Sequence, residues 1–255
     1  LPYVAGGLTD EADPAENDEE WGRYLNWGAD LKYNLTSDLT LNGTFQPDFG
    51  QVEADPAVLN LSPFETFYGE KRPFFIEGAR FFSHPDFNLF YSRRVGTGDP
   101  NSRIRSAAKL TGKLGGSTTL AALGAFTDVA PPGKVHNPFA RGDEETGFGV
   151  VRVGQDFNDG NQQVHVMGGG VWRRDDTSFR NRRAYSGGLD FDLFFADREY
   201  NVQGSVVGSA VETDGDRVRT EYGTGGALDL RKQAFTVRGG VSGRWESDTL
   251  ELNDL

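Results

Sequence analysis

Apolar and polar residues alternate along most of this chain, beginning near residue 24. A period of two is typical of a strand with one apolar face, and no stretch shows the helical period. The pattern predicts about ten antiparallel strands, over residues 24–33, 38–46, 103–114, 118–127, 151–157, 164–172, 185–195, 200–206, 217–231 and 235–246. Only within 118–127 does it fail to separate the two faces. We therefore expect an all-β fold, an antiparallel up-and-down meander.

The connections between these strands alternate in length. The shorter ones are 34–37, 115–117, 158–161, 196–198 and 231–233. The longer ones are 47–102, 128–146, 174–183 and 213–216. Outer-membrane barrels have short periplasmic turns and longer extracellular loops, whereas a Greek-key sandwich has no reason to alternate this way.

Aromatic residues on the apolar face gather at both ends of the strands. Near the short turns these are Tyr33, Phe157, Phe195, Tyr200 and Phe235. Near the long loops they are Phe45, Phe126, Trp172, Tyr185 and Trp245. The two groups resemble the aromatic girdles of a membrane barrel. The opposite face is charged, which suits a wet lumen, but a soluble antiparallel sheet also turns polar residues outward and stays the alternative.

Composition narrows the function classes. The net charge of −12 argues against nucleic acid as a partner, because phosphate binding needs a basic surface. With no Cys and only three scattered His, we expect no zinc site, no cofactor and no catalytic triad. No apolar run approaches the ~18 residues of a spanning helix. The 34 Gly suit turns and curved strands, and the tracts at 168–170, 187–188 and 239–240 are expected inside strands.

We expect the chain to be a segment of a longer barrel that continues beyond both of its ends. Residues 1–8 could end an earlier strand, and 253–255 should lead into another. We therefore take 1–255 as one incomplete β-barrel domain, of unknown total strand number and oligomeric state. Residues 9–20 carry seven acidic residues and no basic one, and are expected to be a solvated loop.

The long segment 47–102 interrupts the hairpins and is dense in Phe, Pro and charge. A structureless loop of this length is unusual, so it is either functional or a packed element. Two interpretations stay open: a loop folded into the lumen as a plug, or an extracellular cap with its own apolar cluster. The candidate binding residues in it are Asp48, Glu53, Asp55, Glu65, Glu70, Lys71, Arg72, Glu77, Arg93 and Arg94.

Three motifs in this region resemble those of a bacterial domain family of unknown function. They are QPDFGQVEADP at 46–56, EKRPFFIEG at 70–78 and FYSRRVG at 90–96. The family's versions read NPDFGQVEADP, EKRPFFLEG and FYSRRIG, so Gln46 replaces the usual Asn. The resemblance is close over 24–115 and looser afterwards. It implies a partial outer-membrane β-barrel, commonly placed behind an export signal and a family 9 carbohydrate-binding-like module.

The resemblance and the pattern together imply a place in the outer membrane of a Gram-negative-type bacterium, in contact with its lipid. The expected role is uptake, capture or surface display of carbohydrate or another polymer. Two alternatives are kept: a carbohydrate-active hydrolase working with an upstream module, and a structural or adhesive surface protein. The family supplies no catalytic residue, so we expect none in this segment.

Overall fold

The computed structural model describes residues 2–12, 19–47, 67–96, 102–129, 144–175, 180–213, 219–233, 238–250 and 252. In this part of the chain, the secondary structure is almost entirely β. The strands are β1 (Pro2–Ala12), β2 (Glu19–Asn34), β3 (Leu39–Phe45), β4 (Ser102–Leu114), β5 (Thr118–Val129), β6 (Glu144–Phe157), β7 (Gln162–Asp175), β8 (Arg180–Phe195), β9 (Tyr200–Thr213), β10 (Arg219–Gln233) and β11 (Arg238–Glu246).

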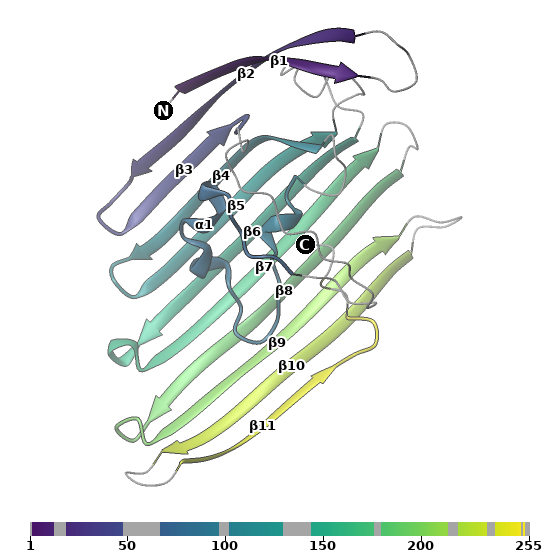
Figure 1. Cartoon of the computed structure of the whole chain (residues 1–255). Helices are drawn as coiled ribbons and strands as arrows, with labels where there is room; N and C mark the ends of the chain where they lie inside the picture. The colour runs from purple at the N-terminus through teal and green to yellow at the C-terminus, as the bar shows by residue number, and fades with distance from the viewer. Residues whose placement is uncertain are drawn as a thin grey trace.

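All the described strands belong to one sheet of eleven, ordered β1 to β11 as in the sequence. Each is antiparallel to its neighbours, from the β1–β2 pair to the β10–β11 pair. Figure 1 shows the resulting meander, with β1 and β11 at opposite edges and the sheet not closed. The predicted all-β antiparallel meander is confirmed, because the period-two pattern specified both the strands and their order.

Many strand boundaries differ from the sequence prediction, and most of the described strands are longer than expected. An additional strand, β1, pairs with an extended β2, so the expected loop at 9–20 is partly strand. The expected connections at 174–183 and 213–216 overlap strands at their ends, since β7 continues to Asp175, β8 starts at Arg180 and β9 reaches Thr213. Residues 176–179 and 214–218 lie outside the described residues. The backbone pairing of these long strands continues into the polar residues at their ends, beyond the residues whose alternating pattern predicted a strand. The contrast between long and short connections is therefore weaker than predicted.

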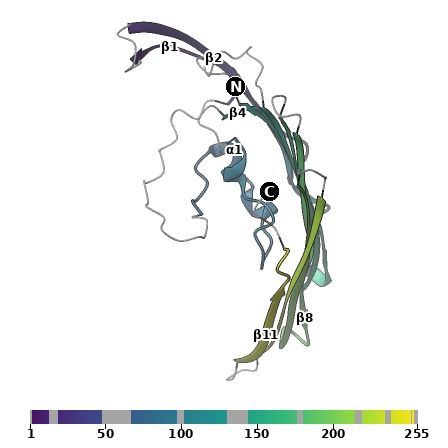
Figure 2. The same cartoon turned by 90° about the vertical axis from the view of Figure 1, so that its right-hand side faces the viewer.

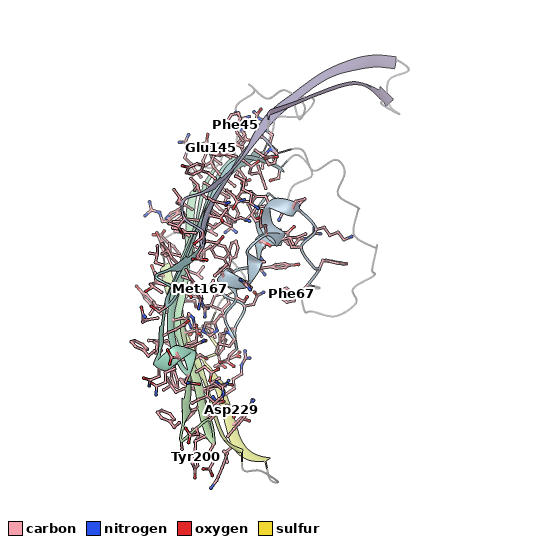
Figure 3. All side chains as sticks on the ribbon, turned by 90° about the vertical axis from the view of Figure 1, so that its left-hand side faces the viewer. Phe45, Phe67, Glu145, Met167, Tyr200 and Asp229 are labelled. Atoms are coloured by element: carbon pink, nitrogen blue, oxygen red, sulfur yellow. The ribbon has the colours of Figure 1, made fainter. Side chains whose placement is uncertain are left out.

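The sheet is curved (Figure 2), and its two faces carry different kinds of side chain. Residues 67–96, here called the inner segment, lie on its concave side (Figures 1 and 2). Side chains of the concave face are buried and often polar, as with Lys109, Arg152 and Asp190. On the convex face, large apolar side chains are exposed, including Val166 and Leu189. Figure 3 shows both sets standing on opposite sides of the ribbon.

The structure also separates the faces of β5. Thr119, Ala121, Leu123, Ala125 and Thr127 are buried on the concave side. Small residues at the alternate positions had hidden this difference, because Ala and Gly carry little information about which face they occupy.

The hydrophobic core lies between the concave face and the inner segment. Its buried members on the inner segment are Phe75, Phe82, Phe87, Leu89 and Val95. The strands contribute Ile104, Ala107, Ala121, Leu123, Ala125, Phe148, Val150, Met167, Val171 and Val207. Among the described residues, no helix has both the length and the apolar character needed to cross a membrane.

Candidate functional site

The inner segment is a chain of short turns that follows the concave face. It contains α1 (Pro73–Ile76) and the 3-10 turns η1 (Ala79–Phe82) and η2 (Ser92–Arg94). Proline at the start of α1 fixes φ and gives up no intrahelical bond there. Gly78 has φ 73°, a left-handed conformation that lets the chain turn from α1 into η1. Phe side chains then point back into the core rather than away from the sheet.

Polar side chains of three strands, β4, β6 and β8, hold the backbone of this segment. Lys109 on β4 donates to the carbonyl oxygens of Phe74 and Glu77. Arg152 on β6 donates to the Ser83 carbonyl at 2.5 Å. Ser186 on β8 donates to the Leu89 carbonyl at 3.4 Å. The polar half of the alternating pattern therefore has a structural role, because it pairs with loop carbonyls that would otherwise lose their hydrogen bonds to water.

A second group of contacts comes from β9 and β11. Ser205 donates to Asp86 Oδ2 at 2.5 Å, and Arg244 Nη1 donates to the Asp86 carbonyl at 2.8 Å. The guanidinium of Arg244 also lies 4.3 Å from the centre of the Phe87 ring. The inner segment thus reaches across the sheet from β4 to β11.

Glu70 and Arg72, both predicted candidates, form the anchor of the segment itself. Arg72 is buried, pairs with Glu70 at 2.8 Å, and donates to the carbonyls of Val95 and Ser92, each at 2.6 Å. Burial alone would raise the pKa of Glu70, but hydrogen bonds from Arg72 and Ser92 hold that pKa below its ordinary value. These residues close a ring between the two ends of the segment, which is a structural role.

Glu77 faces the sheet near β2 and β3. Its carboxylate pairs with Lys32 and accepts from Asn42 Nδ2 at 3.2 Å. The hydrogen bond from Lys32 lowers the pKa of Glu77, and nearby Lys109 acts in the same direction. Glu77 is therefore an ionised contact between the inner segment and β2–β3.

The other predicted candidates do not gather at one point. Arg94 Nη1 donates to the Leu252 carbonyl at 3.4 Å, and its guanidinium lies 5.5 Å from the Tyr91 ring centre. Lys71 and Arg93 both have interaction partners in the molecule. Asp48, Glu53, Asp55 and Glu65 lie outside the described residues, as does Phe235 of the predicted girdle.

Sequence reasoning missed the most buried charge cluster on the concave face. Arg152 Nη2 lies 2.8 Å from both carboxylate oxygens of Asp190, and its hydrogen bond goes to Oδ1. His165 Nδ1 lies 3.1 Å from the same Oδ1, and His84 Nε2 lies 4.0 Å from Oδ2. The four residues come from β6, β7, β8 and the inner segment. No local motif could reveal them, although each strand member sits at a polar position of the alternating pattern.

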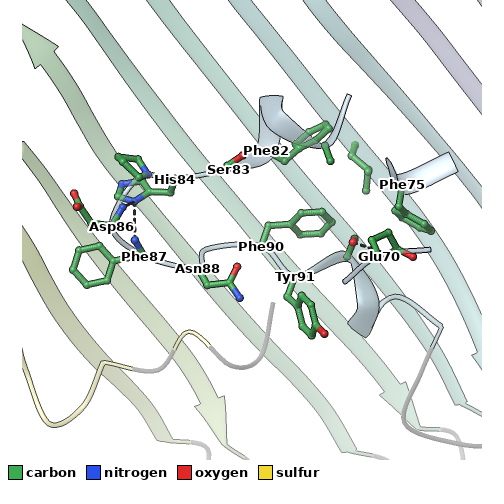
Figure 4. A pocket seen from close by; sticks show the side chains of 14 residues that line it. Glu70, Phe75, Phe82, Ser83, His84, Asp86, Phe87, Asn88, Phe90 and Tyr91 are labelled. Atoms are coloured by element: carbon green, nitrogen blue, oxygen red, sulfur yellow. Dashed lines mark hydrogen bonds between the residues drawn. The ribbon is translucent and has the colours of Figure 1, made fainter. Parts of the chain in front are cut away.

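His84 is held in one tautomer by its own turn. Its Nδ1 accepts from the backbone N–H groups of Phe87 at 3.2 Å and Asp86 at 3.4 Å, so the ring proton belongs on Nε2 (Figure 4). Burial lowers the pKa of His84 by more than the carboxylate of Asp190 raises it. The imidazole is therefore neutral, with its N–H group turned toward Asp190.

Three hollows surround the inner segment. One of about 570 Å³ lies between residues 83–86 and β6–β11, and one of about 920 Å³ lies toward the short turns of β3–β7. Both are lined by Arg152, Gln163 and His165. A third, of about 410 Å³, is walled by aromatic side chains including Phe82, Phe90 and Tyr91 (Figure 4). The inner segment fills only part of the concave side and leaves polar space beside it.

The arrangement places hydrogen-bonding side chains beside a cavity. Asp190 accepts a hydrogen bond from Arg152, and neither nearby His contacts a serine hydroxyl in the described geometry. Among the described residues, no group of three or more His, Asp or Glu side chains could hold a metal ion. The site offers fixed donors and acceptors around a cavity, which is the usual composition of a small-molecule site.

Comparison with known proteins gives one match. The family model described as "Domain of unknown function (DUF5916)" matches residues 1–121. That range includes β1 to β4, the inner segment and the start of β5. No curated protein and no solved structure matches this chain. Over residues 1–121 the chain is thus similar to a domain of unknown function, which supports the expected resemblance at that level.

Proposed function

We propose that this chain is part of the wall of an outer-membrane β-barrel that takes up or captures a polar solute. The convex face meets lipid, the concave face lines the lumen, and the inner segment narrows that lumen. One observation carries the proposal: the exposed face of the sheet is apolar and the covered face is charged. A soluble sheet does the reverse, because exposing large apolar side chains to water is unfavourable.

The aromatic positions fit the same proposal. Phe45, Trp172, Tyr185 and Trp245 are exposed on the convex face near one end of the strands, and Tyr33, Phe157, Phe195 and Tyr200 near the other. Ten residues separate Tyr185 from Phe195, about 33 Å along a strand, which a tilt of ~40° reduces to about 25 Å. That is the height of the apolar band in outer-membrane barrels. Between the bands lie Val, Leu, Ala and Gly residues.

The contacts of the inner segment support its placement inside the proposed lumen. They join it to β2, β3, β4, β6, β8, β9 and β11 through Lys, Arg, Ser and Asn side chains. A cap resting on loops outside the barrel would instead touch mainly strand ends. This favours the in-folded interpretation for residues 67–96, with polar passages left beside the segment.

The expected carbohydrate ligand, the hydrolase and the adhesive surface protein stay predictions. The first acids that a hydrolase would use, Asp48 and Glu53, lie outside the described residues. No contact among the described residues favours catalysis over binding.

Fractionation of the full-length protein in its bacterial host tests the proposal. We expect it in the outer membrane, with a faster gel mobility before heating than after, as intact β-barrels show. An outer-membrane lipoprotein and a periplasmic enzyme serve as markers. Recovery as a soluble periplasmic monomer would contradict the proposal.

A further inference from the structure

Two buried polar atoms face each other without hydrogen bonds at the edge of the 570 Å³ cavity. They are His84 Nε2 and Asp190 Oδ2, 4.0 Å apart, on side chains that are 0% and 7% exposed. Among the groups that shift the pKa of His84, the Leu189 carbonyl has the smallest effect, and it raises that pKa. His84 Nε2 nevertheless has no hydrogen bond of normal geometry. Asp190 Oδ2 keeps its ion pair with Arg152 Nη2 at 2.8 Å, whereas the His84 Nε2–H group has no partner of normal geometry. Leaving a buried donor unpaired is unfavourable, so a missing hydrogen-bond partner is expected.

The chemistry of the two atoms defines that partner. His84 Nε2 carries a proton, because Nδ1 already accepts two backbone N–H groups. Asp190 Oδ2 is a carboxylate oxygen beside the Arg152 guanidinium and serves as a hydrogen-bond acceptor. A group that fits both must accept from nitrogen and donate to oxygen at about 2.7–2.9 Å. A hydroxyl group does both, whereas a carboxylate or an ammonium group does only one.

The rest of the wall favours a neutral ligand. Its charged side chains are already satisfied within the protein: Arg231 pairs with Asp229 at 2.6 Å, and Asp192 accepts from Asn201 at 2.5 Å. Arg244 pairs with Glu246. The amides of Gln163 and Gln203 and the hydroxyl of Ser242 also line the cavity. Amides and hydroxyls both donate and accept, which again matches hydroxyl groups.

We propose that the cavity between residues 83–86 and β6–β11 binds a neutral polyhydroxylated molecule, one hydroxyl of which bridges His84 and Asp190. The volume of about 570 Å³ is within the range of small-molecule sites. This inference deepens the proposed uptake function and rests on it for the route by which the ligand arrives. The binding itself depends only on the docked inner segment.

Calorimetric titration of the purified full-length protein, folded in a detergent without a sugar headgroup, tests the site. The probes are maltose, myo-inositol and glycerol. Maltose with every hydroxyl methylated is the chemical control, because it can accept but not donate. Succinate tests for an ionic ligand. We expect saturable binding of at least one polyol, a loss of about tenfold or more on methylation, and none with succinate.

Two variants test whether the binding depends on side chains that line this cavity. Asp190→Asn removes the acceptor at Oδ2, and Gln163→Leu removes a lining amide without touching the ion pair. Each is expected to weaken polyol binding by about tenfold or more, equal to ~1.4 kcal/mol. Asp197→Asn, in the exposed turn at 196–199, is the matched control and should bind as the parent does. Heat-modifiable mobility and circular dichroism verify that each variant is folded. If Asp190→Asn does not fold, Gln163→Leu still tests the site.

Three results would overturn the inference: no binding of any polyol, equal binding of methylated maltose, or full binding by a folded Gln163→Leu variant. The outcome is separate from that of fractionation. Polyol binding by a protein that proves periplasmic would contradict the proposed barrel and support the binding site. An outer-membrane protein that binds no polyol would support the barrel and contradict the binding site.

Discussion

Single buried charges decide much of the behaviour of the concave face. Arg152 and Asp190 have side chains only 8% and 7% exposed, and each is the other's charged partner. Arg152 also holds the Ser83 carbonyl, so one guanidinium joins β6 and β8 to the inner segment. Such a pair adds little net stability, but removing one member leaves the other charged and buried.

Replacing Arg152 with methionine is therefore expected to lower the free energy of unfolding by about 3–5 kcal/mol. Urea unfolding of the folded protein, followed by tryptophan fluorescence, measures this. The double variant Arg152→Met with Asp190→Leu should recover most of the loss, because no lone charge is left. Losses that simply add in the double variant would show that the ion pair is not the cause.

Gly154 offers a second residue-scale prediction. A Cβ built there would lie 2.0 Å from His165 Cδ2, so Gly154→Ala must displace the imidazole from Asp190. We expect a loss of about 1–3 kcal/mol in the free energy of unfolding. Gly239→Ala is the control, because nothing lies within 4 Å of its added Cβ. Equal stability of the two variants would argue against the His165 packing described above.

At the scale of elements, the inner segment is the one that can respond to its surroundings. Its Glu70, Glu77 and His84 all have pKa values below their ordinary ones. Each therefore binds a proton more weakly when the segment is docked than when it is free. The docked state is favoured above the ordinary pKa values and loses that advantage as pH falls.

Acidification should accordingly loosen the inner segment in two stages. Protonation of free His84 begins to compete below its ordinary value of 6.5, and that of the two glutamates below 4.5. Hydrogen exchange of amides in 73–95, corrected for the intrinsic effect of pH, is expected to accelerate between pH 7 and pH 5. Amides in the centre of β7 provide the control. Equal protection of 73–95 at both pH values would contradict the expected sign.

The alternating pattern predicted the elements well and the site poorly, for a physical reason. Strand order follows from local alternation and short turns, as between Leu189 and Val206, which pair across one hairpin. The site joins His84, Arg152 and Asp190, which meet only after the inner segment crosses the sheet. The motif residues Glu70 and Arg72 were found because they act locally, on one another.

The two faces of the sheet set the behaviour of the whole molecule. Val166 is 55% exposed at the middle of the convex face, between the aromatic bands. In a soluble protein an arginine there would change stability by no more than about 0.5 kcal/mol. In a bilayer the same change buries a charge in hydrocarbon.

Val166→Arg is thus expected to destabilise the protein by about 2–4 kcal/mol in lipid vesicles. Unfolding by urea from phosphatidylcholine vesicles measures it. Ser117→Arg, in the turn at 115–117, supplies the control and should have little effect. A harmless Val166→Arg in vesicles would speak against lipid contact of this face.

The neighbour-only pairing of the strands has a mechanical consequence. Because the backbone of each described strand pairs only with the strands beside it, a chain pulled from one end would leave the sheet hairpin by hairpin. Side-chain links bypass this order directly between Arg152 and Asp190, and through the inner segment from Arg244 to Asp86 and from Arg94 to Leu252. A force spectrum should show evenly spaced rupture events. The earliest, from the carboxyl-terminal end, would also have to break the tie at Asp86.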